Sequence, residues 1–271
     1  MDAFQAIVLG IVQGLTEFLP ISSSGHLRIV PAFAGWEDPG AAFTAVIQLG
    51  TMAAVLLYFR RDLWNIGRGW LAGLRDPAVR GTLDSRMGWY LIIGTIPIVI
   101  FGVAFDDAIE EDARSLTLIG TTLIALGLLL LLAERVADHV RPVESVTWRD
   151  SLIIGFAQAA ALVPGVSRSG ATITAGLFLG FDRPAAARFS FLLSVPAVVL
   201  SGVYQLRDIG GEGTVGFVPT ALATIAAFVS GYAAIAFLLK FLVTHTTAVF
   251  VAYRVILGVV VLALVATNVI S

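Results

Sequence analysis

Two charged residues lie inside long apolar stretches, where an ionised side chain is costly. Glu17 lies in the apolar stretch 4–31, and Arg168 lies in the apolar stretch 151–181. An ionised residue at the centre of a bilayer costs about 2.5–3.5 kcal/mol on the insertion scale, so such residues are candidates for function. The alternative interpretation is a structural ion pair between Glu17 and Arg168 that only joins two parts of the chain.

A short polar segment interrupts each of these apolar stretches. Residues 20–26 read PISSSGH, and residues 164–170 read PGVSRSG. Serines after such an interruption can cap the next half-helix, and a helix N-terminus binds phosphate through its free N–H groups and partial positive charge. Arginine adds a planar fork that suits phosphate. The two segments together predict a diphosphate site, although capping alone explains one or two of the serines.

Two further side chains beside the first interruption can take part in chemistry. Gln13 and Glu17 are four residues apart and share one face of a helix. Their amide and carboxylate oxygens offer two ligands for Mg²⁺ or Ca²⁺, although this spacing is common and the signal is weak. His26 is the one histidine next to an interruption. It can act as a general acid or base on a hydroxyl or a phosphate, or it can be structural.

The composition indicates a membrane protein. Of 271 residues, 58% are hydrophobic and 13% are charged, whereas soluble domains carry about 25% charged residues. A soluble enzyme, a disordered protein and a nucleic-acid binder are therefore not expected, and we expect no nucleic-acid partner. The chain has no cysteine, which excludes disulfides, a thiolate nucleophile and a cysteine-based metal site.

Six stretches are long and apolar enough to span a bilayer: 41–59, 88–105, 116–133, 185–206, 217–239 and 248–270. In the two interrupted stretches each half is too short to span, which favours re-entrant hairpins that line a protein cavity over two kinked spans. Six arginines in 60–87 place that loop in the cytoplasm, and the acidic loop 106–114 suits the outside. Both termini are then outside.

The two halves of the chain resemble each other around the interruptions. Five residues of the first half recur 145 positions later: Gly10, Gln13, Ser22, Ser24 and Gly25 match Gly155, Gln158, Ser167, Ser169 and Gly170. Each half is then one broken hairpin followed by three spans, so the second copy must be inverted. We predict an all-α polytopic membrane fold in one domain, 1–271, with repeats at about 1–135 and 150–271. Chance similarity between apolar segments is the alternative.

These motifs resemble those of a known family. The run QGLTEFLP at 13–20, followed by SSSGH at 22–26, resembles the first signature of the undecaprenyl-diphosphate phosphatase family, which is the bacitracin-resistance protein family. The run PGVSRSGAT at 164–172 resembles its second signature, and RFSFLLSVP at 188–196 is also similar to the family. The resemblance covers essentially the whole chain.

The resemblance implies an enzyme of the bacterial inner membrane that hydrolyses undecaprenyl diphosphate to undecaprenyl phosphate and inorganic phosphate. This reaction recycles the lipid carrier for peptidoglycan synthesis and confers bacitracin resistance. The site would face the periplasm and depend on a divalent cation, Mg²⁺ or Ca²⁺. Position 13 is Glu in many relatives, and Gln13 is a weaker metal ligand.

The resemblance also assigns residues to roles. The catalytic residues would be Glu17, Ser23, His26 and Arg168, and the metal ligands would be Gln13 and Glu17. The residues that bind the phosphates would be Ser22, Ser24, Gly25, Ser167, Ser169, Gly170 and Thr172. The nucleophile is either Ser23, which we favour, or a water activated by Glu17 or His26.

Two questions stay open at the level of sequence. Inverted repeats with broken helices are also the plan of many transporters, so the alternative function is a flippase for polyprenyl phosphate. The oligomeric state is not set by the sequence either, and a homodimer is one option. In both interpretations the partners are a polyprenyl lipid and the surrounding membrane lipids.

Overall fold

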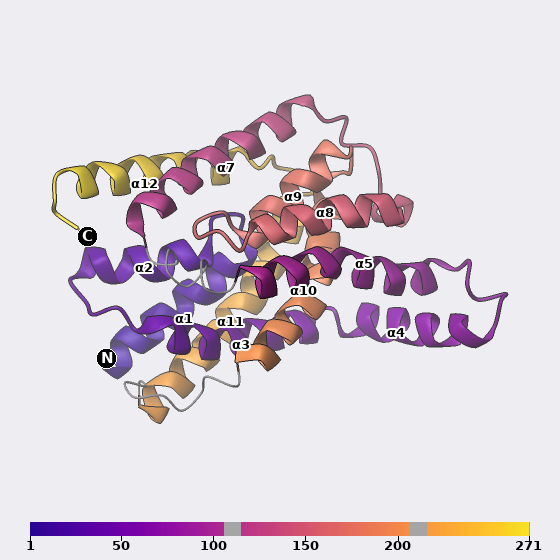
Figure 1. Cartoon of the computed structure of the whole chain (residues 1–271), viewed down its shortest axis with the longest axis horizontal. Helices are drawn as coiled ribbons and strands as arrows, with labels where there is room; N and C mark the ends of the chain where they lie inside the picture. Colours follow the sequence, from indigo (N-terminus) through magenta and orange to yellow (C-terminus); the bar gives the residue numbers. More distant parts are fainter. Residues whose placement is uncertain (106–114, 206–215, 271) are drawn as a thin grey trace.

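The fold is a bundle of helices, described for residues 1–105, 115–205 and 216–270 in a computed structural model (Figure 1). A short 3₁₀ helix, Val143–Ser145, precedes the second half. The α-helices of the described residues are α1 Ala3–Phe18, α2 Ser23–Ala34, α3 Gly40–Tyr58, α4 Arg60–Arg75, α5 Leu83–Ala104, α7 Leu116–Val136, α8 Trp148–Ala160, α9 Arg168–Phe178, α10 Arg183–Gln205, α11 Phe217–Phe241 and α12 Ala248–Ala266.

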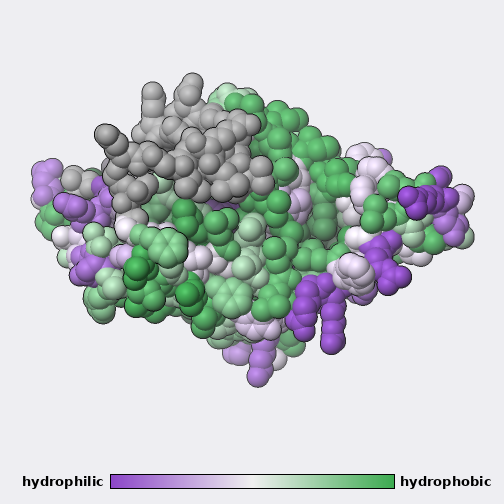
Figure 2. Space-filling model, turned by 90° about the horizontal axis from the view of Figure 1, so that it is seen from below, coloured by the Kyte–Doolittle hydropathy of each residue, from purple (hydrophilic) through white to green (hydrophobic). Residues whose placement is uncertain are grey.

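The helices confirm an all-α, multi-pass membrane protein. Five of the described helices, α5, α7, α10, α11 and α12, are long and apolar enough to cross a membrane. The sixth predicted span, α3, meets the same criteria only together with α4, from which it is bent by 73°. Figure 2 shows hydrophobic side chains over the middle of one face and hydrophilic ones mostly at the two ends of the long axis. The acidic loop 106–114 lies outside the described residues.

The first interrupted stretch folds as a hairpin. Helix α1 ends at Phe18, helix α2 begins at Ser23, and the two helices pack against each other. The rings of Phe4, at the start of α1, and Trp36, just after α2, lie 6.3 Å apart. The chain therefore returns to the end of the bundle at which it entered, as a re-entrant hairpin requires.

The second interrupted stretch folds in the same way, and Arg141 joins the two ends of its hairpin. The Arg141 guanidinium donates to Asp150 Oδ2 at the start of α8, at 2.7 Å, and to the Leu179 carbonyl after α9, at 2.8 Å. Burial alone would raise the pKa of Asp150, but hydrogen bonds from Arg141 and Thr147 hold that pKa below its ordinary value.

The two hairpins open at opposite ends of α7. Ile29 of α2 packs with Leu116 at the start of α7, whereas Glu134 near the end of α7 pairs with Arg183 at the start of α10, beside the second hairpin. Figure 1 shows both chain termini at one end of the long axis and the α4–α5 connection at the other. The arrangement suits two inverted repeats, but that relation and the limits of the repeats stay predictions.

Glycines allow each hairpin to lie very close to one long span. A Cβ added at Gly10 of α1 would lie 2.2 Å from the Ala223 carbonyl oxygen of α11. A Cβ added at Gly155 of α8 would lie 2.4 Å from the Gly94 carbonyl oxygen of α5. Since no side chain fits at either contact, α1 packs closely on α11, and α8 packs closely on α5. The tips of the two hairpins contact each other inside the bundle.

Candidate active site

The Glu17 carboxylate, one residue before the end of α1, is the centre of a group of polar contacts. Its Oε1 accepts a hydrogen bond from the Arg168 guanidinium at 3.1 Å. Its Oε2 accepts from the Ser23 hydroxyl at 2.6 Å and from the Gln13 amide at 3.2 Å. Only 10% of the Glu17 side chain and 21% of the Arg168 side chain are exposed. The structure therefore brings the two buried charges together, along with two more predicted site residues.

The two residues that meet at Glu17 occupy the same position in their helices. Ser23 is the first residue of α2, and Arg168 is the first residue of α9. The residues before them, Ser22 and Ser167, both have a positive φ, 77° and 72°. This conformation is uncommon for residues other than glycine and is often found at functional sites.

The hydroxyls of Ser22 and Ser167 cap the two half-helices. Ser22 Oγ accepts from the Gly25 N–H at 3.3 Å, and Ser167 Oγ accepts from the Gly170 N–H at 3.1 Å. The first N–H groups of a helix have no acceptor within the helix. The N–H groups of the first two residues of α2 and of α9 thus stay available for an anion, and both half-helices carry the partial positive charge of an N-terminus.

The other predicted phosphate-binding residues differ in how free their hydroxyls are. Ser169 donates to the Leu19 carbonyl at 3.0 Å and so ties α9 to the first break. Thr172 is bonded to the Arg168 carbonyl and to Ser190, at 2.8 and 2.6 Å. Ser24 is exposed, and within the described residues its hydroxyl has one hydrogen-bond partner, the Ser22 hydroxyl at 3.3 Å. Of these three hydroxyls, that of Ser24 is therefore the most accessible to a ligand.

His26 is held by other partners than Glu17 and Ser23. Its Nδ1 lies 2.7 Å from the Ser22 carbonyl oxygen, and its Nε2 lies 2.7 Å from the Tyr253 hydroxyl of α12. A carbonyl only accepts, so Nδ1 carries the proton, and in the neutral ring Nε2 accepts from Tyr253. In the described part of the chain no hydrogen bond joins His26 to Glu17 or Ser23. Tyr253 was not anticipated from the sequence.

The residues around Glu17 offer oxygen ligands to a divalent cation. Gln13 Oε1 is buried and has no hydrogen-bond partner within the described residues, so it is available as a ligand. Glu17 adds a carboxylate, and hard cations such as Mg²⁺ and Ca²⁺ prefer oxygen. Within the described residues no group of three or more His, Cys, Asp or Glu side chains is placed to hold a metal. The donors fit a cation whose remaining ligands come from the substrate or water.

Arg254 of α12 contacts both breaks and was missed from the sequence, which singled out only Glu17 and Arg168 as unexplained charges. Its side chain is fully buried. It donates to the Pro20 carbonyl of the first break at 3.1 Å and to the Gly165 and Val166 carbonyls of the second break at 3.1 and 3.0 Å. The signal was available, since Arg254 is the one charged residue in the nineteen residues of α12.

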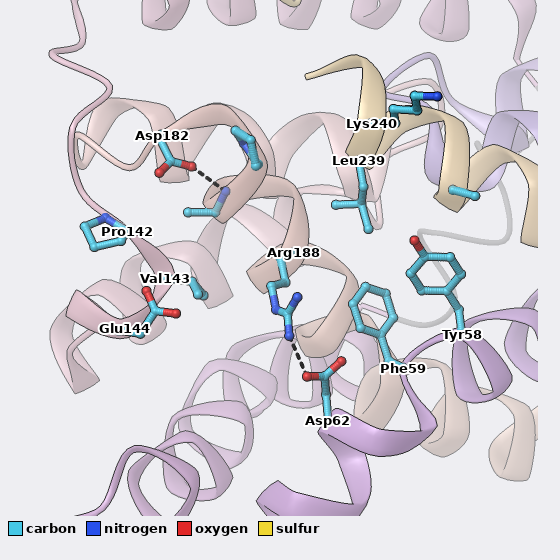
Figure 3. A pocket seen from close by; sticks show the side chains of 13 residues that line it. Tyr58, Phe59, Asp62, Pro142, Val143, Glu144, Asp182, Arg188, Leu239 and Lys240 are labelled. Atoms are coloured by element: carbon cyan, nitrogen blue, oxygen red, sulfur yellow. Dashed lines mark hydrogen bonds and ion pairs between the residues drawn. The ribbon is translucent and has the colours of Figure 1, made fainter. Parts of the chain in front are cut away.

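A small pocket opens beside the Glu17–Arg168 pair, and a larger cavity of about 640 Å³ lies apart from it. The small pocket is lined by Glu17, Phe18, Arg168, Ser169, Ser190, Phe191 and Ser194. Figure 3 shows the larger cavity, where Arg188 points toward Asp62 and forms an ion pair with it. Phe191 contacts both Phe18 of the small pocket and Phe59 of the cavity, with ring centroids 5.4 and 6.2 Å apart, so aromatic rings lie between the two spaces.

Comparisons with known proteins identify the family of this chain. The family model described as bacitracin resistance protein BacA matches residues 6–260. A protein of a Nocardioides species named undecaprenyl-diphosphatase is 58% identical over all of this chain and 99% of its own length. Proteins of the same name from Chlorobaculum parvum and Thermobifida fusca are 52% and 51% identical, over 99% and 100% of this chain and 99% and 93% of their own lengths. The chain therefore belongs to the bacitracin resistance protein BacA family.

Proposed function

We propose that this chain hydrolyses undecaprenyl diphosphate to undecaprenyl phosphate and inorganic phosphate. Relatives named undecaprenyl-diphosphatase are similar to it along its whole length. The observation that carries the proposal is the position of Glu17, whose two carboxylate oxygens contact the first residues of two half-helices, Ser23 and Arg168. Two helix N-termini and an arginine then face one diphosphate, with a carboxylate and a hydroxyl between them.

The reaction needs a nucleophile on the distal phosphorus and a base for its proton. The 2.6 Å contact from Ser23 Oγ to Glu17 Oε2 places a base beside the hydroxyl. Ser23 Oγ would bond to the distal phosphorus while the bridging P–O bond breaks, and its proton would pass to Glu17. Undecaprenyl phosphate leaves, and water then hydrolyses the phosphoserine to inorganic phosphate. In the alternative route, Glu17 takes the proton from a water that attacks directly.

The other predicted site residues would bind the phosphates rather than move protons. The Arg168 guanidinium and the N–H groups at the starts of α2 and α9 would stabilise the negative charge that builds up in the transition state. His26 is a weaker candidate for the base, because Ser22 and Tyr253 already engage both of its ring nitrogens. Its role would be to hold the start of α2 against α12.

A divalent cation is part of the proposal. Gln13 Oε1 and the Glu17 carboxylate would hold it, with phosphate oxygens of the substrate as further ligands. When bound, Mg²⁺ or Ca²⁺ would neutralise charge on the diphosphate. The charge of Arg168 is already balanced by the Glu17 carboxylate. The proposal therefore requires a bound cation to neutralise the diphosphate.

We place the protein in the bacterial inner membrane with its site open to the periplasm. The support is the distribution of charge: the arginine-rich region around the α4–α5 connection lies at the opposite end of the bundle from both termini. Arginine is enriched in cytoplasmic loops. The first hairpin enters from the end that holds the termini, so its polar break would be reached from outside. The product, undecaprenyl phosphate, would be released on that side and would serve again as a lipid carrier for peptidoglycan.

Phosphate release by the purified protein tests the proposal. Wild-type protein with Mg²⁺ or Ca²⁺ should release phosphate from undecaprenyl diphosphate, and Glu17→Ala and Arg168→Ala should each abolish the release. Arg188→Ala is the matched control, because this arginine pairs with Asp62 in the larger cavity, away from Glu17. Activity that survives in both Glu17→Ala and Arg168→Ala would show that the site is wrong.

The second candidate function is movement of polyprenyl phosphate across the membrane. The larger cavity favours it, since a polar space lies on the far side of Phe191 and Phe59 from the small pocket. In liposomes, a flippase would move labelled polyprenyl phosphate between leaflets even with Glu17→Ala in place. Release of phosphate without such movement would leave hydrolysis as the activity.

A further inference from the structure

Arg254 connects both hairpins at the residues that precede their second half-helices. It donates to Pro20 of the first break and to Gly165 and Val166 of the second, and also to the Leu123 carbonyl of α7 at 3.2 Å. No carboxylate of the described residues pairs with it. A fully buried guanidinium is costly unless its donors are satisfied, so these carbonyls account for its place inside the bundle.

The packing around Arg254 leaves room for its side chain and for little else. A Cβ added at Gly170 of α9 would lie 2.8 Å from the Arg254 Nη1, and a Cβ added at Gly127 of α7 would lie 3.3 Å from the Arg254 Cβ. Gly170 was predicted from the sequence to bind phosphate, and the structure shows in addition that a larger residue at this position would collide with Arg254. The guanidinium lies in a site whose shape comes from α7, α9 and α12 together.

We infer that Arg254 is a positioning residue that fixes the two half-helix N-termini relative to each other. Without it, α9 is tied to the first break by single contacts from Arg168 to Glu17 and from Ser169 to Leu19. The planar fork reaches carbonyls of both breaks at once, which one ammonium group cannot do in the same geometry. Those carbonyl oxygens are also kept from facing a phosphate, where they would repel it.

The charge of Arg254 has a second consequence for the ligand. Glu17 and Arg168 cancel each other, and Arg254 has no carboxylate partner among the described residues, so these three residues together carry a net positive charge in a region of low dielectric constant. Attraction to a diphosphate is strong there. The inference rests on the proposed function for its effect on catalysis, but the connection of the two breaks does not depend on that function.

The test combines hydrogen exchange with kinetics in the purified full chain. Arg254→Lys keeps the charge and loses the fork, and Arg254→Met loses both. Thr122→Val is the matched control, because it removes the hydroxyl that bonds to the Pro164 carbonyl of the second break at 2.7 Å and keeps the Thr122 carbonyl, which accepts from Arg254 at 3.4 Å. Backbone exchange is measured by mass spectrometry at 19–26 and 163–171, and kcat and KM are measured with undecaprenyl diphosphate.

We expect faster exchange at both breaks in Arg254→Lys and at the second break alone in Thr122→Val. Misplacement of reacting groups by about 1 Å can cost 10²-fold in rate, so kcat should fall about 100-fold in Arg254→Lys with less than about threefold change in KM. Arg254→Met should also raise KM, because the charge is gone.

Two results would overturn the inference. The first is an Arg254→Lys variant in which hydrogen exchange at both breaks and kcat are the same as in the wild type. The other is faster exchange in all spans alike, which would mean that Arg254 only stabilises the bundle. If the wild type releases no phosphate, the proposed function fails instead, and the exchange measurements still decide whether Arg254 joins the two breaks. If Arg254→Met does not fold, Arg254→Lys carries the test.

Discussion

Replacing Ser23 by alanine separates the two routes that the geometry allows. The Ser23 hydroxyl donates to Glu17 Oε2 at 2.6 Å and stands at the first position of α2. Ser22, not Ser23, caps the helix, so Ser23→Ala removes one oxygen without removing the cap. The fold should persist, and the change in rate reports on chemistry.

The size of the loss depends on what the hydroxyl does. If Ser23 only donates a hydrogen bond to Glu17, its removal costs about 1.5–3 kcal/mol, the range for hydrogen bonds to charged groups. At about 1.36 kcal/mol per factor of ten, kcat then falls roughly 10- to 150-fold. Loss of a serine nucleophile has far larger effects, roughly 10⁶-fold in a serine protease. We expect a loss of more than about 10³-fold.

The assay is phosphate release, together with a single-turnover reaction quenched in acid. With substrate labelled in the distal phosphate, wild-type protein should retain label as phosphoserine at position 23. Thr121→Ala is the matched control, because its hydroxyl is exposed and bonds to the Thr117 carbonyl of its own helix. A loss below about 150-fold without trapped label would refute the covalent route and leave attack by water.

Three further changes test the surroundings of the site. Tyr253→Phe removes the hydroxyl that bonds to His26 Nε2, so we expect kcat to fall about tenfold or less with an unchanged pH profile, because His26 only holds the start of α2; a changed profile would show that His26 moves a proton in the reaction. Gln13→Glu supplies a second carboxylate, so the cation concentration for half-maximal activity after chelation should fall; no change would remove Gln13 from the metal site. Because the pKa of Asp150 is lowered, its ionised form stabilises the fold at pH values above the ordinary 3.8, and this stabilisation is lost as the pH falls below that value. The acid-induced loss of thermal stability should therefore be smaller in Asp150→Asn than in the wild type. An equal loss would contradict the role of its hydrogen bonds.

The spans and the two breaks could be predicted because hydrophobicity reports them directly. The predicted spans 116–133 and 217–239 correspond to Leu116–Val136 and Phe217–Phe241. Glu17 and Arg168 were predicted to be site candidates because each is a charge at a break, and the structure places them 3.1 Å apart, in the ion pair that was the alternative interpretation. Patterns within one stretch of chain were sufficient for these predictions.

The contributions of α12 could not be read in the same way. Tyr253 meets His26 across 227 positions of sequence, and Arg254 reaches the first break across 234. Such contacts depend on how α12 packs against α7 and the hairpins, which local patterns do not report. The partners of His26 were unpredictable for this reason, whereas the lone charge of Arg254 within an apolar helix was a visible signal.

The most direct test of the account is a double-mutant cycle across the two breaks. Phosphate release from undecaprenyl diphosphate is measured for wild type, Glu17→Gln, Arg168→Met and the double variant. If the two residues act as one site, the double variant should lose about as much kcat as the worse single variant, because groups that act as a unit are not additive. Losses that multiply, or a double variant that still turns over near the wild-type rate, would contradict the claim that the two breaks form one catalytic centre.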